Sequence, residues 1–507
     1  MFAQILGSTL LGLHGILVRV EVDISNGIPA FDIVGLPDIA VRESKERVRA
    51  AIKNAGFEFP AKRITINLAP ADLKKDSSGL DLPIAIGILA ASGHIAPERC
   101  QEYLFVAELS LDGKLRGVSG ILPMAIHSAE QKVMSLFTAP ENVQEGLLVD
   151  QLTVFSPESL QEVVHHLKGE HLLSPSIKIR PPVQVHPDLD DFSEIQGQVA
   201  AKRGLEVAAA GGHNLLMVGP PGSGKTMLAK RIVSILPTMT NQEALEVTKI
   251  YSVAGMLNGN MGLVHTRPFR APHHTISDAG MVGGGRIPRP GEITLSHHGV
   301  LFLDEFPEFP RAVLEVLRQP LEDGEVTISR VNASFTYPAK VILVASMNPC
   351  PCGFLNDSET ACSCSANDIH RYVKKISGPL LDRMDIHIHV PRLKYSELTS
   401  TAYNESSASV RHRVQTAREI QHERLKKYSI FCNGQMGHRQ LKETCIMNKE
   451  AQGILKLAFH KLGLSARGYD RVIKVARTIA DLDSSEVIDA EHIAEAIQFR
   501  SNLVKEL

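Results

Sequence analysis

An eight-residue glycine-rich segment has the residue types needed to bind phosphate groups. Residues 219–226 match the pattern G-x-x-x-x-G-K-[ST] in full. Glycines allow successive backbone N–H groups to turn toward phosphates, Lys225 can reach the outer phosphates, and the Thr226 hydroxyl can bind Mg²⁺. A purely structural glycine turn is the alternative interpretation. The expected nucleotide-binding residues are Gly219, Pro220, Pro221, Gly222, Ser223, Gly224, Lys225 and Thr226.

Two acidic residues, Asp304 and Glu305, follow the apolar run 300–303. In a phosphate-binding sheet, a carboxylate at the end of a neighbouring strand holds Mg²⁺, which fits Asp304. Glu305 is then placed to polarise an attacking water. Such a pair is more often a solvated strand end when it stands alone. Downstream of the glycine-rich segment, we expect it to support nucleotide hydrolysis.

Asn348 follows a third apolar run, residues 341–345. Ligands of parallel sheets bind at the carboxyl ends of the strands, so this amide is predicted to lie between the Asp304 strand and the phosphates. There it would sense the outermost phosphate. A turn residue before Pro349 is an equally good interpretation.

Four of the seven cysteines gather just after Asn348, as two Cys-x-Cys pairs separated by nine residues. Four thiolates suit tetrahedral Zn²⁺, although two residues between paired cysteines are commoner. A redox-active pair or free thiols are the alternatives. The candidate zinc ligands are Cys350, Cys352, Cys362 and Cys364.

The elements that must position these residues are a strand over 215–218 before the glycine-rich segment and a helix over 227–236 after it. Residues 1–170 alternate strand and helix patterns and predict an α/β domain. Paired prolines make 171–190 a linker, and a second α/β block extends to 395. Residues 396–507 show helical periodicity, clearest over 451–462, 469–481 and 490–499.

The chain has 507 residues, enough for about three domains. Hydrophobic residues make up 44% and charged residues 22%, which excludes a disordered chain and a membrane protein. The apolar run 82–97 falls short of the roughly 20 residues that a membrane span needs. Seven cysteines are too few for a disulfide scaffold, so we expect a cytoplasmic protein. The net charge of −2 excludes an overall basic coat but no local basic patch.

Further motifs resemble a known family. The glycine-rich segment, Leu-Phe-Leu-Asp-Glu at 301–305, Gly-Pro-Leu-Leu-Asp-Arg at 378–383 and Ser-Ala-Arg at 465–467 are similar to magnesium-chelatase-like AAA+ ATPases. Segments 34–38, 211–214 and 267–275 resemble the ComM/YifB family within that group. The resemblance implies an AAA+ P-loop core with a C-terminal helical lid, ATP and Mg²⁺ as cofactors, and a homo-hexamer that hydrolyses ATP between subunits.

The resemblance also implies roles for arginines. Arg383 would be the finger that reaches the γ-phosphate of a neighbouring subunit, and Arg467 the sensor of its own subunit, with Arg471 as a second candidate. From residues alone, an arginine beside Asp382 and Asp385 is more often a surface ion pair.

The family resemblance implies a ring helicase that drives branch migration on single-stranded or branched DNA in natural transformation and homologous recombination, with recombination proteins as partners.

Two candidate hairpins are predicted to supply DNA contacts. In segment 267–298, with a net charge of +2, Gly283–Gly285 would form a tip beside Arg286 and Arg289. In 326–337, Arg330 or Asn332 would lie at the tip. Ordinary surface hairpins are the alternative for both. The +5 segment 411–440 is a further contact or a solvated helix face.

Residues 1–170 resemble the Lon-protease-like domain of the ribosomal S5 domain 2 type. Gly79 and Leu122 stand where that family has its nucleophilic serine and its lysine, so the domain is expected to be a non-proteolytic platform. Candidate DNA or partner contacts are Lys62, Arg63, Lys74 and Lys75, with a solvated lysine patch as the alternative.

Two other functions remain open. A magnesium-chelatase motor subunit would use the same core to remodel a protein, but it is not expected to have the N-terminal domain. An ATP-dependent peptidase would need Ser77 or Ser78 as its nucleophile.

Overall fold

The computed structural model consists of two compact units, each with its own hydrophobic core. It describes residues 1–75, 77–178, 190–257, 262–285, 289–330, 333–357, 359–398 and 404–500. The first unit contains 1–184 and 241–264, and the second contains 185–240 and 265–507. Segment 241–264, which the sequence analysis placed in the second α/β block, therefore packs with the N-terminal unit. Most of the expected linker, residues 179–189, lies outside the described residues.

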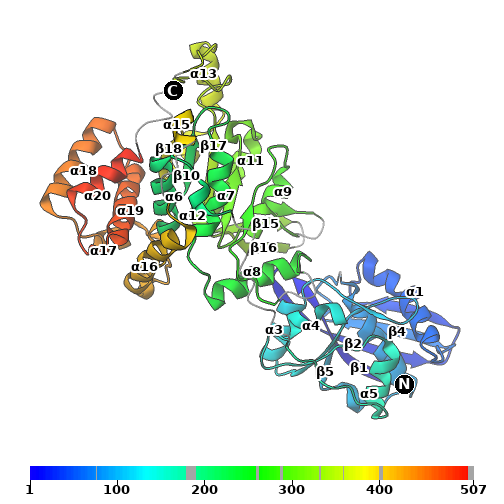
Figure 1. Cartoon of the computed structure of the whole chain (residues 1–507). Coiled ribbons are helices and arrows are strands. Elements are labelled where there is room, and N and C mark those ends of the chain that lie inside the picture. Colours follow the sequence, from blue (N-terminus) through cyan, green and yellow to red (C-terminus); the bar gives the residue numbers. More distant parts are fainter. Residues whose placement is uncertain are drawn as a thin grey trace. The chain divides into compact units, whose positions relative to one another are not determined.

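The N-terminal unit is built on a mixed sheet of seven strands in the order β3-β4-β2-β1-β5-β8-β9 (Figure 1). Long antiparallel β1 and β2 form its centre, and β5, β8 and β9 extend it in parallel. Alternate residues of β2 are buried, as expected for a strand with one face on a core. The strands are β1 (Phe2–Leu11), β2 (His14–Ser25), β3 (Ala30–Val34), β4 (Arg63–Ala69), β5 (Tyr103–Val106), β8 (Ser135–Thr138) and β9 (Thr153–Phe155), with the small ribbon β6 (Glu108–Leu109) and β7 (Leu115–Arg116).

Helix α2 (Asp81–Ala91) explains the apolar run noted in the sequence, because every one of its residues is buried in this unit. Its Asp81 carboxylate accepts hydrogen bonds from Arg47, with Nε 2.7 Å from Oδ2. Helix α8 (Asn241–Val253) joins the unit by packing on α3, and its Ser252 hydroxyl donates to Glu145 of α4 at 2.6 Å. The other helices are α1 (Ile39–Asn54), α3 (Ile121–Glu130), α4 (Val143–Gly146) and α5 (Leu160–Lys168).

The second unit contains a parallel sheet of five strands in the order β11-β14-β17-β10-β18. Strands β10 and β14 are buried at every residue, which is why they appear in the sequence as continuous apolar runs. Both occupy the predicted ranges. The strands are β10 (Leu215–Val218), β11 (Phe269–Arg270), β14 (Val300–Leu303), β17 (Ile342–Met347) and β18 (Ile386–His389).

Helices cover this sheet and form the C-terminal region. Helix α6 packs on β18, α7 on β17, and α19 on α6, so the C-terminal helices share the core of the second unit. The predicted helices over 451–462, 469–481 and 490–499 are confirmed as α18, α19 and α20. The bounds are α6 (Val199–Gly211), α7 (Lys225–Ile235), α9 (Asp278–Val282), α10 (Glu292–Leu295), α11 (Arg311–Val316), α12 (Pro320–Asp323), α13 (Ala366–Lys374), α14 (Gly378–Leu381), α15 (Tyr395–Leu398), α16 (Ser407–Leu425), α17 (His438–Thr444), α18 (Lys449–Leu462), α19 (Ala466–Leu482) and α20 (Ala490–Gln498).

Two antiparallel hairpins extend from the second unit. The first pairs β12 (Gly283–Gly284) with β13 (Arg289–Pro290), so two of the three glycines form a strand arm instead of the predicted tip. The second pairs β15 (Glu325–Arg330) with β16 (Ala333–Pro338), as the sequence predicts. The hairpins touch, because a Cβ on Gly283 would lie 2.9 Å from the Ile328 side chain.

Among the described residues, no helix has both the length and the apolar character that crossing a membrane would demand.

Candidate nucleotide-binding site

The glycine-rich segment lies between β10 and α7, in the predicted order of strand, loop and helix. Gly222 and Gly224 have φ values of +76° and +89°, which only glycine adopts readily. Gly219 is required for space, because a Cβ there would lie 2.1 Å from the Val390 carbonyl oxygen. Helix α7 begins at Lys225, so its unpaired N–H groups face the loop.

Lys225 is the buried cation of this loop. Its ammonium donates to the carbonyl oxygens of Gly219 and Pro220 at 2.7 and 2.9 Å, and to the side-chain oxygen of Asn348 at 3.2 Å. Burial disfavours its charged form and lowers the pKa of Lys225 to about 8. The structure therefore brings together the loop and Asn348, which are 123 residues apart in the chain.

Thr226 and Asp304 form an oxygen pair beside Lys225. The Thr226 hydroxyl donates to the Asp304 carboxylate at 2.7 Å, and the Ser346 hydroxyl donates to its other oxygen. This contact is possible because β17 lies between β14 and β10 in the sheet. Hydroxyl and carboxylate oxygens are ligands that suit Mg²⁺. Ser346 was not predicted as a site residue. It belongs to no recognisable motif, and the one signal that could have indicated it is its position two residues before Asn348.

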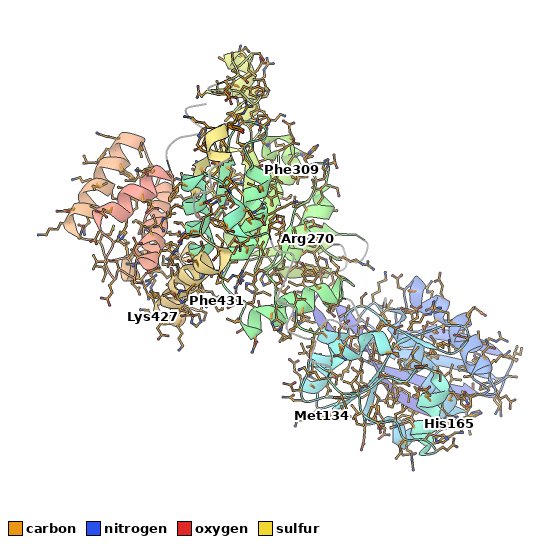
Figure 2. The ribbon with its side chains drawn as sticks, viewed as in Figure 1. Met134, His165, Arg270, Phe309, Lys427 and Phe431 are labelled. Carbon is orange, nitrogen blue, oxygen red and sulfur yellow. The ribbon has the colours of Figure 1, made fainter. Side chains whose placement is uncertain are left out.

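Glu305 extends past the strand end, and its side chain is 58% exposed. Its backbone has a φ of +53°, rare outside glycine, which turns the chain directly after Asp304. His274 approaches the carboxylate, with Nδ1 3.4 Å from Oε2, and its ring contacts Phe309 edge-on (Figure 2 labels Phe309). His274 lies within segment 267–275, whose family resemblance predicted no role for this side chain.

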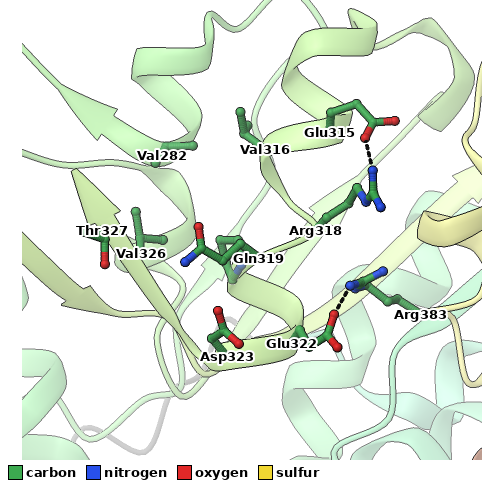
Figure 3. Close-up of a pocket in the computed structure, with 11 residues that line it drawn as sticks. Val282, Glu315, Val316, Arg318, Gln319, Glu322, Asp323, Val326, Thr327 and Arg383 are labelled. Atoms are coloured by element: carbon green, nitrogen blue, oxygen red, sulfur yellow. Dashed lines mark hydrogen bonds and ion pairs between the residues drawn. The ribbon is translucent and has the colours of Figure 1, made fainter. Parts of the chain in front are cut away.

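The two arginines expected to act on nucleotide share one carboxylate. Arg383 pairs with Glu322, and Arg467 donates to the other oxygen of that carboxylate at 3.4 Å. Figure 3 shows Arg383 and Glu322 at one side of a cavity of about 500 Å³ whose lining also includes Val282, Val326 and Thr327 of the hairpin region. Arg471 is held elsewhere, with its Nε 3.1 Å from the Asp385 carboxylate. Nothing in the sequence marks Glu322.

The arginines of segment 267–298 differ in exposure. Arg267 donates to the carbonyl oxygens of Pro237 and His298, and Arg270, which Figure 2 labels, makes two 2.7 Å bonds to Glu292. Arg289 is exposed on β13. Arg286 lies outside the described residues, and Arg330 ends β15 in the second hairpin.

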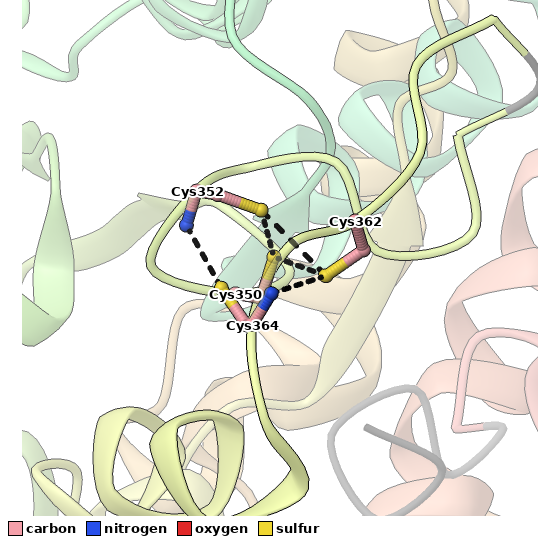
Figure 4. Close-up of side chains that lie close together, drawn as sticks. All are labelled: Cys350, Cys352, Cys362 and Cys364. Carbon is pink, nitrogen blue, oxygen red and sulfur yellow. Dashed lines mark hydrogen bonds between the residues drawn. The ribbon is translucent and has the colours of Figure 1, made fainter.

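The four cysteines after β17 converge as predicted for a shared ligand (Figure 4). Their sulfur atoms all lie within 4.8 Å of one another, Cys350 is buried, and the other three are partly exposed. Backbone N–H groups of Phe354 and Ser363 stabilise the Cys352 thiolate and lower the pKa of this thiol to about 5.

The N-terminal unit lacks a serine–lysine arrangement at the positions compared above. A Cβ on Gly79 would lie 3.0 Å from Val106 and 3.1 Å from Ser77, so the site is crowded for a larger residue. Lys75 is wrong as a surface contact, because it is fully buried and its ammonium donates to the carbonyl oxygens of Gly35 and Pro70. Lys74 pairs with Asp38 at 3.1 Å, whereas Lys62 and Arg63 are exposed.

Three family models cover most of the chain. The model described as magnesium chelatase, subunit ChlI, matches residues 191–398, and the model for the C-terminal part of that subunit matches 404–500. A third, described as subunit ChlI of Mg-chelatase, matches residues 20–142. The sequence led us to expect that the N-terminal domain would rule against a chelatase motor, but this match means that the domain alone does not separate the two functions.

Individual relatives match at different lengths. Competence protein ComM of Haemophilus influenzae is 46% identical over 497 residues, which cover 97% of this chain and 96% of that protein. The uncharacterized protein YifB of Escherichia coli is 44% identical, with 97% and 95% covered. The magnesium-chelatase 38 kDa subunit of Rhodobacter capsulatus is 27% identical over 177 residues, which cover 31% of this chain and 50% of that subunit.

Proposed function

The chain belongs to the ComM/YifB family of magnesium-chelatase-like AAA+ proteins, and from this membership we propose that it is an ATP-driven DNA translocase that works as a hexameric ring. The family implies ATP and Mg²⁺. The observation that carries the proposal is the convergence of Lys225, Thr226, Asp304 and Asn348 at the carboxyl ends of β10, β14 and β17. This grouping supports ATP hydrolysis as the source of motion.

In the proposed reaction, the backbone N–H groups of residues 222–226, which end the glycine-rich segment and begin α7, bind the phosphates. Lys225 exchanges its carbonyl partners for phosphate oxygens, and Asn348 orients the Lys225 ammonium through their 3.2 Å contact. Thr226 and Asp304 would hold Mg²⁺, which neutralises charge on the phosphates. Glu305, exposed beyond Asp304, accepts the proton of the attacking water.

Two arginines complete the proposed site. Arg467 would act on the nucleotide of its own subunit, and Arg383 on the nucleotide of the neighbour, where a guanidinium stabilises transition-state charge. Both contact Glu322 in this structure, so each must exchange this carboxylate for a phosphate. Glu322 would hold the two side chains ready until nucleotide attracts them.

The two touching hairpins are the proposed DNA contacts. Arg289 is exposed on one, and Arg330 ends a strand of the other; with Arg286 they would bind phosphates without reading sequence, which suits a motor that moves along DNA. We infer that the substrates are single-stranded or branched DNA, and that the activity is branch migration in natural transformation and recombination. The relative named for competence supports this inference.

A magnesium-chelatase motor is the second candidate, because three chelatase family models match the chain. The extent of the matches favours the DNA motor, because the match covers 96% of ComM but only 50% of the chelatase subunit. A peptidase is disfavoured because Lys75, the lysine near Ser77 and Ser78, is engaged by two carbonyl oxygens.

The test is ATP turnover of the full chain with and without single-stranded, double-stranded and branched DNA. We expect DNA to stimulate turnover, Lys225→Ala to abolish it, and Glu305→Gln to bind ATP without hydrolysing it. Glu305→Gln is the matched control, because it removes the base and leaves the phosphate contacts in place. Turnover that is indifferent to every DNA would contradict the translocase and favour the chelatase motor.

A further inference from the structure

The loop between β17 and α13 brings its four cysteines to one point. Cys350 and Cys352 follow β17 directly, and Cys362 and Cys364 precede α13. Asp357 turns the intervening chain, its carboxylate accepting from the N–H groups of Glu359 and Thr360 at 2.8 and 2.9 Å. The two Cys-x-Cys pairs therefore lie together, one near each end of this loop (Figure 4).

The spacing of the sulfur atoms is that of a metal tetrahedron. Sulfurs at about 2.3 Å from a central zinc ion lie about 3.8 Å from one another. The Cys350 sulfur lies 3.3 Å from that of Cys352 and 3.7 Å from that of Cys362, and the Cys352 and Cys362 sulfurs are 3.6 Å apart. The Cys364 sulfur lies within 4.8 Å of the other three. The two sulfurs of a disulfide would lie about 2.05 Å apart. These three distances are all longer and are similar to one another, so they do not mark any two of the cysteines as a disulfide pair.

Backbone N–H groups support thiolate ligands here. The Cys352 N–H points to the Cys364 sulfur, and the Cys364 N–H points to the Cys362 sulfur, both at 3.4 Å. Such bonds favour anionic sulfur, and four thiolates crowded together without a cation would repel one another. Outer bonds of this kind also orient the ligands of metal sites.

We propose that Cys350, Cys352, Cys362 and Cys364 bind one structural Zn²⁺ ion, which fixes the loop against the nucleotide site. All four tetrahedral positions are filled by thiolates, so the ion has no open position for a substrate and its role is to hold the chain.

The loop touches the phosphate-binding segment at Gly353. Its φ is +88°, and a Cβ there would lie 2.6 Å from the Pro221 ring, so the Gly353 backbone packs directly on the glycine-rich segment. On the other side, Asn348 precedes Cys350 by two residues and contacts Lys225. The zinc ion would therefore hold both Asn348 and Pro221 in position. This consequence, unlike the metal site, rests on the proposed ATP hydrolysis.

The metal site is tested by elemental analysis of the full chain, purified without chelator. We expect close to one zinc per chain, most of it lost in the double variant Cys362→Ala/Cys364→Ala and kept in Cys445→Ala, whose cysteine lies outside the cluster. Wild-type chain loaded with cobalt should show the absorption bands of tetrahedral thiolate ligation, a measurement that needs no variant to fold. Substoichiometric zinc, iron in its place, a disulfide, or absent cobalt bands would overturn the site.

The coupling is tested on the same proteins. The zinc-free double variant should hydrolyse ATP at least about tenfold more slowly, because misplacing a catalytic group by about 1 Å costs on the order of 10²-fold. Glu305→Gln is expected to keep its zinc while losing hydrolysis. Unchanged hydrolysis in the zinc-free variant would overturn the coupling alone. Stoichiometric zinc in a wild-type chain without ATP turnover would instead overturn the proposed function and leave the metal site standing.

Discussion

At the scale of single residues, Lys225 has a charge that its surroundings make sensitive to pH. Burial lowers its pKa to about 8, so the free protein loses this positive charge as pH rises through 8. Bound phosphates favour the charged form, and binding above pH 8 must therefore take up a proton. Linkage then makes the affinity for ATP fall with rising pH, by up to about tenfold per unit.

This pH dependence can be measured by titrating a fluorescent ATP analogue at pH 7, 8 and 9. We expect a nearly constant dissociation constant below pH 8 and a rising one above it. Lys225→Ala should bind weakly at every pH without this trend. A native profile that stays flat from pH 7 to 9 would show that Lys225 keeps its proton without nucleotide.

At the scale of elements, the first hairpin depends on a glycine. Gly283 has a φ of +105°, and a Cβ would lie 2.4 Å from the Arg289 carbonyl oxygen and 2.9 Å from Ile328. Gly283→Ala should therefore separate β12 from β13 and from the second hairpin, at a strain of about 1–3 kcal/mol. We expect DNA stimulation of ATP turnover to fall several-fold, and far more than unstimulated turnover. Gly453→Ala on α18, where a Cβ meets no atom within 4 Å, is the matched control, and equal DNA responses in the two variants would argue against the hairpin's role.

The sequence predicted elements well where local signals decide them. Strands β10 and β14 appear as buried apolar runs, and α18, α19 and α20 as periodic ones. Contacts between distant segments could not be predicted from the sequence. The residues of α8 carry no signal that tells which unit the helix belongs to, and only its packing on α3 assigns it to the N-terminal unit. Likewise, the role of Glu322 could be recognised only in the fold, where Arg383 before β18 and Arg467 on α19 both reach its carboxylate. Lys75 resembled a surface lysine until folding buried it.

At the scale of the whole molecule, the proposed ring divides each ATP site between two subunits. One subunit supplies Lys225, Asp304 and Glu305, which gather around one loop. Arg383 lines a different cavity with Glu322, and its guanidinium is bonded to Glu322 and to the Pro379 carbonyl oxygen. A chain that hydrolysed ATP as a monomer would need Arg383 to cross to its own glycine-rich segment, whereas a ring needs only the neighbour's segment to approach it.

Mixing two inactive variants tests this division. Lys225→Ala and Arg383→Ala should each hydrolyse almost no ATP alone, but a Lys225→Ala subunit still offers Arg383 to the intact loop of an Arg383→Ala neighbour. In rings assembled at random from equal amounts, about a quarter of the subunit contacts would form a complete site, so turnover should recover to about a quarter of the native rate. Lys225→Ala mixed with Glu305→Gln is the control, because both changes damage the same subunit's half of the site and no contact becomes complete. Recovery in the control, or none in the first mixture, would place Arg383 outside a shared site.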